Sequence, residues 1–306
     1  MKAALIQAFG GPDIVAIGKS VLRVPQADDI VVRVEAAAVN PLDLKIIAGY
    51  MQQVFPVELP YVPGTDFSGV VESVGAQVTH VHVGDRVVGR TQPSAGGALA
   101  KQVVVAASSV VVMPQGMSFE QGAAVPTAFG TASQALFDTG ALKHGETVLI
   151  HAAAGGVGSM AVQLAHEAGA RVVATASPRN HDLVRSLGAD EVIDYRTQDV
   201  SEWRGVDLVI DTIGGETLEK SWSTLGAHGR IASTVEFGIA ARDGHAGGFV
   251  FFADAARFLP EAFRLFEEGR LQVVTDAIVK LDDARSALER LATGHARGKL
   301  IVRVGQ

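Results

Sequence analysis

Small residues crowd the stretch HAAAGGVGSM, residues 151–160, directly after the aliphatic run TVLI. A spacing of small-x-Gly-x-x-Gly between a strand and a helix gives a tight turn, lets the backbone approach a pyrophosphate, and packs the helix on the strand. The start of the helix adds free N–H groups and the positive end of the helix dipole. The stretch therefore predicts a dinucleotide-binding loop, made of Ala153, Gly155, Gly156, Val157 and Gly158.

The end of the next strand indicates which dinucleotide binds. In NAD sites an acidic side chain usually stands there and holds the ribose 2′-hydroxyl. Here this position falls near Ser177, and Arg179 follows. No acidic residue occurs at the end of this strand, residues 174–181, before Asp182. A hydroxyl and a guanidinium accept a 2′-phosphate that a carboxylate would repel, which favours NADP(H). Tyr195 follows the third strand and could reach the adenosine, while the alternative for Arg179 is an ordinary solvated residue at a helix start.

Alternating strands and helices position this loop. From about residue 118 onward, aliphatic runs such as TVLI, RVVATA and VDLVID alternate with helical stretches, which predicts a doubly wound parallel sheet with helices on both faces. Residues 30–108 instead hold short β-branched runs separated by Gly, Pro and Asp, which predicts a β-rich region. The sequence predicts an α/β fold, and a length of 306 residues suggests two domains.

Composition excludes several classes of function. A net charge of −7 and the absence of a basic stripe argue against a nucleic-acid binder. The chain has no cysteine, which excludes disulfides, thiolate catalysis and cysteine-ligated zinc. The N-terminal stretch lacks a signal-peptide core, and no apolar run is long enough to cross a membrane. We expect a cytoplasmic protein without membrane or nucleic-acid partners.

Motifs along nearly the whole chain carry a family resemblance: AAAVNPLDLK (36–45), VPGTDFSGVVESVG (62–75), VGDRVVG (83–89), TASQAL (131–136), GADEVIDYR (188–196), DLVIDTIGG (207–215), RGKLIVRV (297–304) and the glycine-rich stretch itself. With them the chain resembles the medium-chain dehydrogenase/reductase superfamily, in its zinc-independent quinone oxidoreductase (zeta-crystallin-like) branch. The resemblance implies a GroES-like catalytic domain, residues 1–115 and 270–306, around a Rossmann NADP-binding domain, residues 116–269.

The resemblance also implies that zinc is absent. Asn40 and Pro41 stand where zinc-dependent members have their first cysteine ligand, and residues 64–67, GTDF, replace their Gly-His-Glu motif. His80 and His82 are too few for a catalytic zinc. Without a Lewis acid, hydride transfer needs an acceptor activated by conjugation, which indicates a quinone or an α,β-unsaturated carbonyl compound as the substrate.

Four catalytic residues follow from the resemblance. Asn40 is expected beside the nicotinamide ribose, with Asp43 supporting that turn or serving only as a helix N-cap. Thr131 is expected near the carboxamide or the substrate oxygen. Related enoyl reductases place a tyrosine where this chain has Met51, so the neighbouring Tyr50 is either a group facing the substrate or a half-buried packing residue.

The resemblance also concerns the nicotinamide end and the assembly. Phe249 and Phe251 either line the nicotinamide pocket or pack in the core, and Lys299 is expected to bind the cofactor. The apolar run GGFVFF, residues 247–252, predicts an edge strand that a second copy covers in a homodimer.

Two kinds of alternative stay open. An enoyl-thioester reductase would share the chemistry but need room for a long acyl chain. A non-catalytic protein, such as an NADPH sensor, a lens-type structural protein or an RNA-binding protein, would keep the fold without the reaction, because fold does not dictate function.

Overall fold

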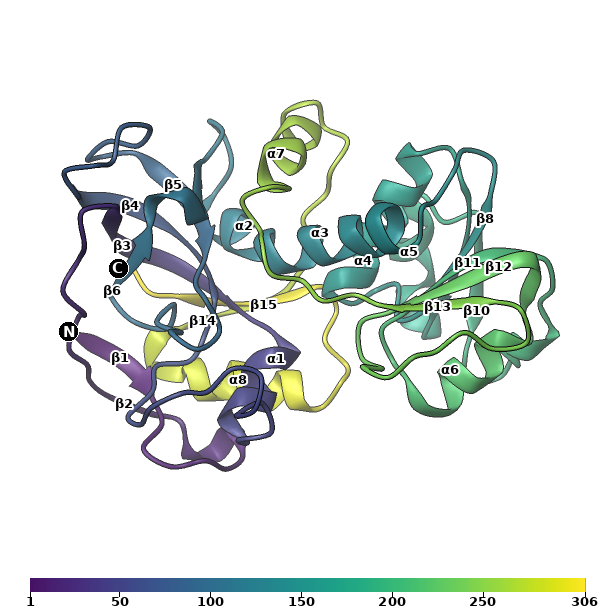
Figure 1. Ribbon diagram of the computed structural model, residues 1–306, viewed down its shortest axis with the longest axis horizontal. Coiled ribbons are helices and arrows are strands. Elements are labelled where there is room, and N and C mark those ends of the chain that lie inside the picture. Colours follow the sequence, from purple (N-terminus) through teal and green to yellow (C-terminus); the bar gives the residue numbers. More distant parts are fainter. Residues whose placement is uncertain (306) are drawn as a thin grey trace. The chain divides into compact units, whose positions relative to one another are not determined.

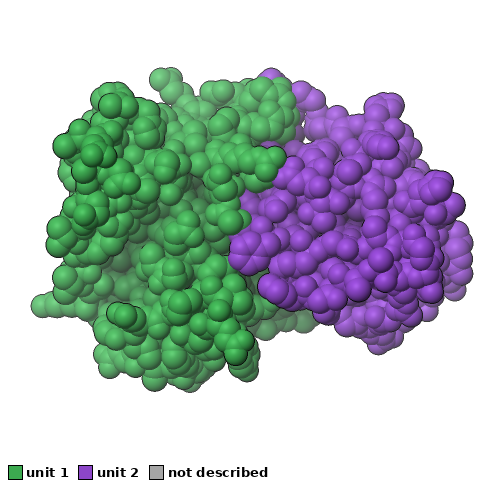
Figure 2. Space-filling model, viewed as in Figure 1, with its two compact units in different colours: residues 1–127, 253–267, 273–306 green, residues 128–252, 268–272 purple. Residues whose placement is uncertain are grey.

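The computed structural model describes residues 1–305, and the chain divides into two compact units that Figure 2 colours separately. The first unit contains residues 1–127, residues 253–267 and the chain from residue 273 onward, and the second contains residues 128–252 and 268–272. The predicted domain limits, after residue 115 and before residue 270, stay a prediction.

A seven-stranded sheet frames the first unit (Figure 1). Its strands are β3 (Asp29–Val39), β4 (Asp66–Val74), β5 (Arg86–Arg90), β6 (Gln102–Ala106), β7 (Val110–Val112), β14 (Thr275–Lys280) and β15 (Lys299–Arg303). The order is β14-β15-β3-β4-β5-β7, with β6 also paired to β3, and only β14 and β15 run parallel. The long strand β3 is central, so its end lies beside β15 on one side and the start of β4 on the other.

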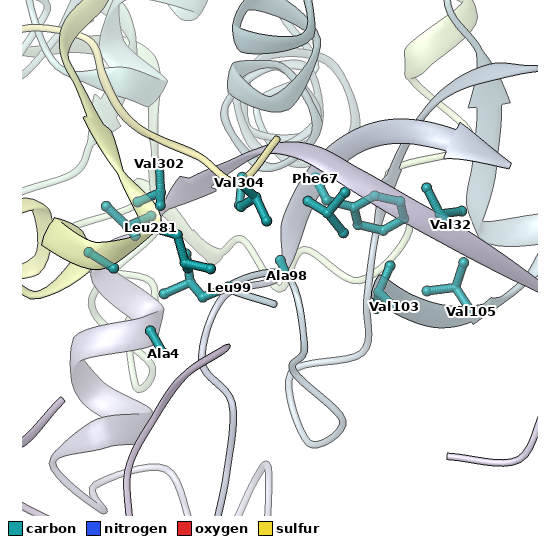
Figure 3. Packing of buried hydrophobic residues seen from close by; sticks show 14 of the residues in the cluster. Ala4, Val32, Phe67, Ala98, Leu99, Val103, Val105, Leu281, Val302 and Val304 are labelled. Atoms are coloured by element: carbon teal, nitrogen blue, oxygen red, sulfur yellow. The ribbon is translucent and has the colours of Figure 1, made fainter. Parts of the chain in front are cut away.

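Helices and short elements complete the first unit. They are β1 (Lys2–Leu5) with β2 (Ala16–Lys19), the 3₁₀ turns η1 (Pro12–Ile14), η2 (Ala107–Ser109) and η6 (Leu281–Asp283), and the helices α1 (Pro41–Ile47), α2 (Phe119–Ala124), α7 (Leu259–Glu267) and α8 (Ala284–Ala292). Side chains from β3, β4, β6 and β15 meet in one buried core, where Phe67 lies close to Val32 (Figure 3). This core fixes the strand ends that carry the polar residues described below.

The second unit is a six-stranded, wholly parallel sheet. Its strands are β8 (Thr147–Ile150), β9 (Arg171–Ala176), β10 (Glu191–Asp194), β11 (Val206–Asp211), β12 (Leu225–Ser233) and β13 (Ala246–Phe249). The order β10-β9-β8-β11-β12-β13 is the doubly wound order 3-2-1-4-5-6. The helical elements are α4 (Gly156–Glu167), α5 (His181–Ser186), α6 (Gly215–Trp222), the 3₁₀ turns η4 (Pro178–Asn180) and η5 (Val200–Glu202), and the π-helical η3 (Gln134–Thr139), which continues α3 (Pro126–Ser133).

The predicted fold class is confirmed. The alternating aliphatic runs became parallel strands because both faces of this sheet are buried, as with Leu149, Val173 and Val209. Of the run predicted as an edge strand, residues 247–249 lie in the edge strand β13, and residues 250–252 follow it. No helix among residues 1–305 has both the length and the hydropathy to span a bilayer.

Candidate active site

The glycine loop, defined as residues 151–158, connects β8 to α4 in the second unit. Ala152 has φ +49°, a left-handed conformation that is uncommon for a residue with a side chain. Its carbonyl oxygen accepts a hydrogen bond of 2.9 Å from the Gly155 N–H. A Cβ atom at Gly158 would lie 2.3 Å from that same oxygen, so glycine is required where the first turn of α4 meets the loop.

The start of α4 fits the phosphates of a dinucleotide. Gly155 is the N-cap residue, and the first N–H groups of this 12-residue helix have no partner within the helix. Gly156 and Val157 are only half-buried, whereas Ala153 is fully buried beneath them. The glycines keep this cradle open to a pyrophosphate, which would accept hydrogen bonds from the N–H groups at the helix start.

The structure brings the predicted cofactor-binding loop and the predicted residues Ser177 and Tyr195 to one edge of the sheet. Because β8, β9 and β10 are parallel neighbours, their carboxyl ends lie side by side, and the glycine loop, Ser177 and Tyr195 follow these ends in turn. Ser177 is buried, and its hydroxyl oxygen accepts a hydrogen bond of 3.2 Å from the Asn180 side chain. Arg179 is exposed in η4, and Tyr195 is exposed with the guanidinium of Arg196 5.8 Å from its ring centroid.

Three further predicted residues lie elsewhere in the second unit. Thr131 is buried in α3. Phe249 is half-buried at the end of β13, and its ring centroid lies 4.7 Å from that of Phe237, with the two rings tilted by 45°. Phe251 is 45% exposed, so it does not pack in the core.

A buried polar cluster, here called the Asn40 cluster, lies in the first unit and contains Asn40, Asp66, Arg90, Thr127 and Lys299. Asp66 accepts hydrogen bonds from the Asn40 amide at 3.0 Å and from the Thr127 hydroxyl at 2.6 Å. The Lys299 ammonium donates to the Asn40 amide oxygen and lies 3.6 Å from Asp66. The Arg90 side chain donates to the Thr127 hydroxyl at 3.1 Å. Both polar atoms of the Asn40 amide are therefore fixed: the oxygen by the Lys299 ammonium and the nitrogen by the Asp66 carboxylate.

Strand pairing explains how distant residues enter this cluster. Ala38 of β3 pairs with Asp66 at the start of β4, which in turn pairs with Arg90 at the end of β5. Lys299 begins β15, which runs beside the last residues of β3. Burial lowers the pKa of the Lys299 ammonium, and nearby Asp66 and Asp43 oppose that shift.

Asp43 is buried directly beside this cluster. One carboxylate oxygen accepts a 2.7 Å hydrogen bond from the Asn40 N–H, and the other has no hydrogen-bond partner among residues 1–305. Asp43 is therefore the third residue of a capping box, and the N-cap of α1 is Asn40. Burial raises the pKa of Asp43 to about 7.

Tyr50 lies in the turn after α1, and 82% of it is exposed. The reading of Tyr50 as a half-buried packing residue is therefore wrong, because α1 ends before this position and leaves the ring in solvent. A role of Tyr50 toward substrate stays a prediction.

His151, Asp66, Arg90 and Thr127 are site residues that sequence reasoning did not assign. His151 directly follows β8 as the first residue of the glycine loop, is fully buried, and has its pKa lowered to about 4 by desolvation. A histidine inside the apolar run TVLIHAAA was the available signal. Asp66 and Arg90 meet through strand pairing, and Thr127 of α3 joins Asp66 across 61 positions, so no local pattern reveals these three.

The two histidines considered for metal binding have other contacts. His80 lies 3.1 Å from the Ala107 carbonyl oxygen, and His82 lies 3.7 Å from Asp85. Among residues 1–305, no three His, Cys, Asp or Glu side chains gather in a way that could hold a metal ion.

Comparisons with known proteins agree with this geometry. The profile of the alcohol dehydrogenase GroES-like domain matches residues 26–115, and the profile of the zinc-binding dehydrogenase domain matches residues 187–302. A chloroplastic quinone-oxidoreductase homolog of Spinacia oleracea is 33% identical over 96% of this chain and 95% of its own.

Solved structures are similar over the full chain. The quinone oxidoreductase of Coxiella burnetii has a TM-score of 0.94 at 34% identity, with 99% of both chains covered. The Escherichia coli quinone oxidoreductase complexed with NADPH has a TM-score of 0.86 at 26% identity, covering 99% of this chain and 100% of its own. The CurK enoyl reductase has a TM-score of 0.88 at 27% identity, with 99% of both chains covered.

Proposed function

Because the chain belongs to the medium-chain dehydrogenase/reductase superfamily, in its quinone oxidoreductase branch, we propose that this oxidoreductase uses NADPH to reduce a quinone or an α,β-unsaturated carbonyl compound. The observation that carries the proposal is the glycine loop, where Gly158 lies against the Ala152 oxygen and the start of α4 is open. The similarity to quinone oxidoreductases supports the acceptor class.

The end of β9 supports NADPH over NADH. Ser177 offers a hydroxyl and Arg179 a guanidinium, and no carboxylate stands between Arg171 and His181. A carboxylate would hold a ribose hydroxyl and repel a phosphate, whereas this pair favours the phosphate. When bound, the nicotinamide supplies a hydride.

The Asn40 cluster supports a role for Asn40 in orientation. Its amide is held by Lys299 and Asp66, so its remaining N–H has a fixed direction. A preorganised donor helps where charge develops on an oxygen, because it costs no reorganisation during the reaction. Asn40 would thus orient the nicotinamide ribose or the acceptor, and Thr131 and Tyr50 are proposed to contact the same reactants.

A steady-state assay tests the proposal. Protein dialysed against a chelator is mixed with NADPH or NADH and a benzoquinone, a naphthoquinone or a short enone. We expect NADPH oxidation that depends on the acceptor and survives chelation. The near-isosteric variant Asn40→Leu should lose at least about tenfold in kcat, while the exposed-site variant Ser286→Ala should match wild type. Binding of NADPH without turnover on any acceptor would favour the sensor alternative.

The similarity to CurK enoyl reductase supports one second candidate, an enoyl-thioester reductase. Crotonyl-CoA in the same assay separates the two. A kcat/KM for the thioester well above that for the quinones would replace the first proposal with this one.

A further inference from the structure

His151 connects three elements around the start of the glycine loop. Its Nε2 lies 2.8 Å from the Ser221 hydroxyl of α6, and its Nδ1 lies 3.2 Å from the Thr175 hydroxyl of β9. All three residues are at least 96% buried, so solvent supplies none of these partners. A buried imidazole must have both nitrogens satisfied by protein groups, and here they are.

A donor and an acceptor can be assigned to every hydrogen bond in this network. The Ser221 hydroxyl donates to the Thr217 carbonyl at 2.7 Å, so it accepts from His151 Nε2–H. His151 Nδ1 then carries a lone pair and accepts from the Thr175 hydroxyl. The Thr175 hydroxyl thus donates its hydrogen bond to the imidazole, and its oxygen accepts one from the Ala152 N–H at 3.2 Å. A neutral His151 satisfies every member of the chain.

Thr175 therefore holds Ala152 and Ala153, the second and third residues of the loop. Its hydroxyl takes the N–H of Ala152, and its carbonyl takes the N–H of Ala153 at 3.0 Å. Ala152 is the residue in the left-handed conformation, and its carbonyl oxygen accepts from Gly155 and lies against Gly158. The direction of the Ala152 peptide thus sets the shape of the loop up to the first turn of α4.

We propose that His151 and Thr175 are positioning residues for cofactor binding: His151 fixes the Thr175 hydroxyl, and this hydroxyl holds Ala152 in the strained conformation that shapes the glycine loop. The inference rests on the proposed function in that the loop binds the dinucleotide. Neither side chain needs to touch the cofactor, because both are buried.

Matched variants separate positioning from general stability. Thr175→Val is nearly isosteric and removes the partner of Ala152, whereas Thr175→Ser keeps the hydroxyl. Ser221→Ala removes a hydrogen bond from the opposite side of the same imidazole and leaves Thr175 untouched. His151→Leu removes the acceptor for the Thr175 hydroxyl, and His151→Asn places an amide oxygen near the position of Nδ1.

Hydrogen exchange of the ligand-free protein is the first measurement, read on peptides covering residues 151–158. We expect Thr175→Val and His151→Leu to speed exchange in these peptides at least fivefold, and Ser221→Ala, Thr175→Ser and His151→Asn to leave it within twofold of wild type. Equal exchange in Thr175→Val and wild type, or equal acceleration in Thr175→Val and Ser221→Ala, would overturn the inference. This result does not depend on whether the protein binds NADPH.

Fluorescence titration with NADPH is the second measurement. We expect Thr175→Val to raise the Kd about tenfold, equivalent to about 1.4 kcal/mol. Ser221→Ala should leave the Kd within twofold of wild type, while lowering Tm about as much as Thr175→Val does. An unchanged Kd for Thr175→Val would refute the link to the cofactor. If wild type bound neither NADPH nor NADH, the proposed function would fail, and the exchange data alone would decide the positioning role.

Discussion

Asp43 and His151 are both buried, and burial moves their pKa values in opposite directions. The pKa of Asp43 rises from 3.8 to about 7, and that of His151 falls from 6.5 to about 4. Asp43 faces Asp66, Lys299 and Arg90, whereas Asp211 is the charged group near His151. Each residue therefore favours its neutral form in the folded protein, and both shifts fall in the same acidic window.

These shifts predict opposing effects on stability. Between about pH 4 and 7 the folded state keeps a proton on Asp43 that the unfolded state has lost, so this contribution falls as pH rises. Between about pH 4 and 6.5 the unfolded state binds a proton at His151 that the folded state rejects, so this contribution rises with pH. Each of these two contributions to the free energy of unfolding is on the order of 3–4 kcal/mol.

Melting curves from pH 4.5 to 8 check this prediction. Asp43→Asn copies the neutral acid, so its Tm relative to wild type should increase as pH rises. For His151→Asn the dependence should be opposite: its Tm relative to wild type should increase as pH falls. A Tm difference that stays constant across this range for Asp43→Asn would contradict the raised pKa.

Arg179 decides the preference for NADPH in a second prediction at this scale. A charge-assisted contact with a phosphate contributes about 1.5–3 kcal/mol. Arg179→Ala should therefore weaken NADPH binding about 10- to 100-fold and leave NADH nearly unchanged. Arg185→Ala removes the same charge from the following helix and serves as the control. Equal weakening of both cofactors would make Arg179 a structural residue, and a wild type that prefers NADH would refute the reading of this strand end.

At the scale of elements, close backbone contacts determine which residue can occupy the turn between β8 and α4. Alanine inside a helix is ordinarily about 1 kcal/mol better than glycine. At Gly158, however, the added Cβ would lie 2.3 Å from a backbone oxygen and 2.8 Å from the Ala153 Cα, and neither atom can move alone. The clash should outweigh the helix preference.

Gly158→Ala should therefore destabilise the protein by about 1–3 kcal/mol, as overpacked sites do. Gly155→Ala should cost less, because its Cβ would lie 3.2 Å from the same oxygen at an ordinary φ of −80°. Urea unfolding of both variants gives the comparison. A Gly158→Ala protein as stable as wild type would show that the loop adapts.

At the scale of the whole molecule, sequence reasoning succeeded where information is local. The parallel sheet followed from alternating aliphatic runs, and the glycine loop followed from spacing within eight residues. The Asn40 cluster could not be predicted in this way, because Lys299 meets Asn40 across 259 positions and only the order of strands brings them together. For Tyr50 the sequence left a substrate-facing group and a half-buried packing residue open, and the packing alternative fails because the ring is exposed, which side-chain type alone does not reveal.

Assembly is the prediction for the whole molecule. The strand β13 is an edge of its sheet, and such edges invite pairing with a second copy. Light scattering at micromolar concentration should give about twice 31.9 kDa. Ala246→Glu would place like charges on the exposed edge and should shift the protein toward monomer. A wild type that is monomeric at this concentration would rule out the homodimer.

The pairing of β3 with β15 also governs the order in which the protein can mature on the ribosome. Lys299 is synthesised 260 positions after Val39, a delay of roughly 13–50 s at about 5–20 residues per second. Strands β8 to β13 emerge within that interval, so the parallel sheet can close while the end of β3 still lacks its neighbour. Until then the end of β3 is paired with β4 on one side only, and the candidate catalytic amide of Asn40 gains its Lys299 donor only when β15 is made.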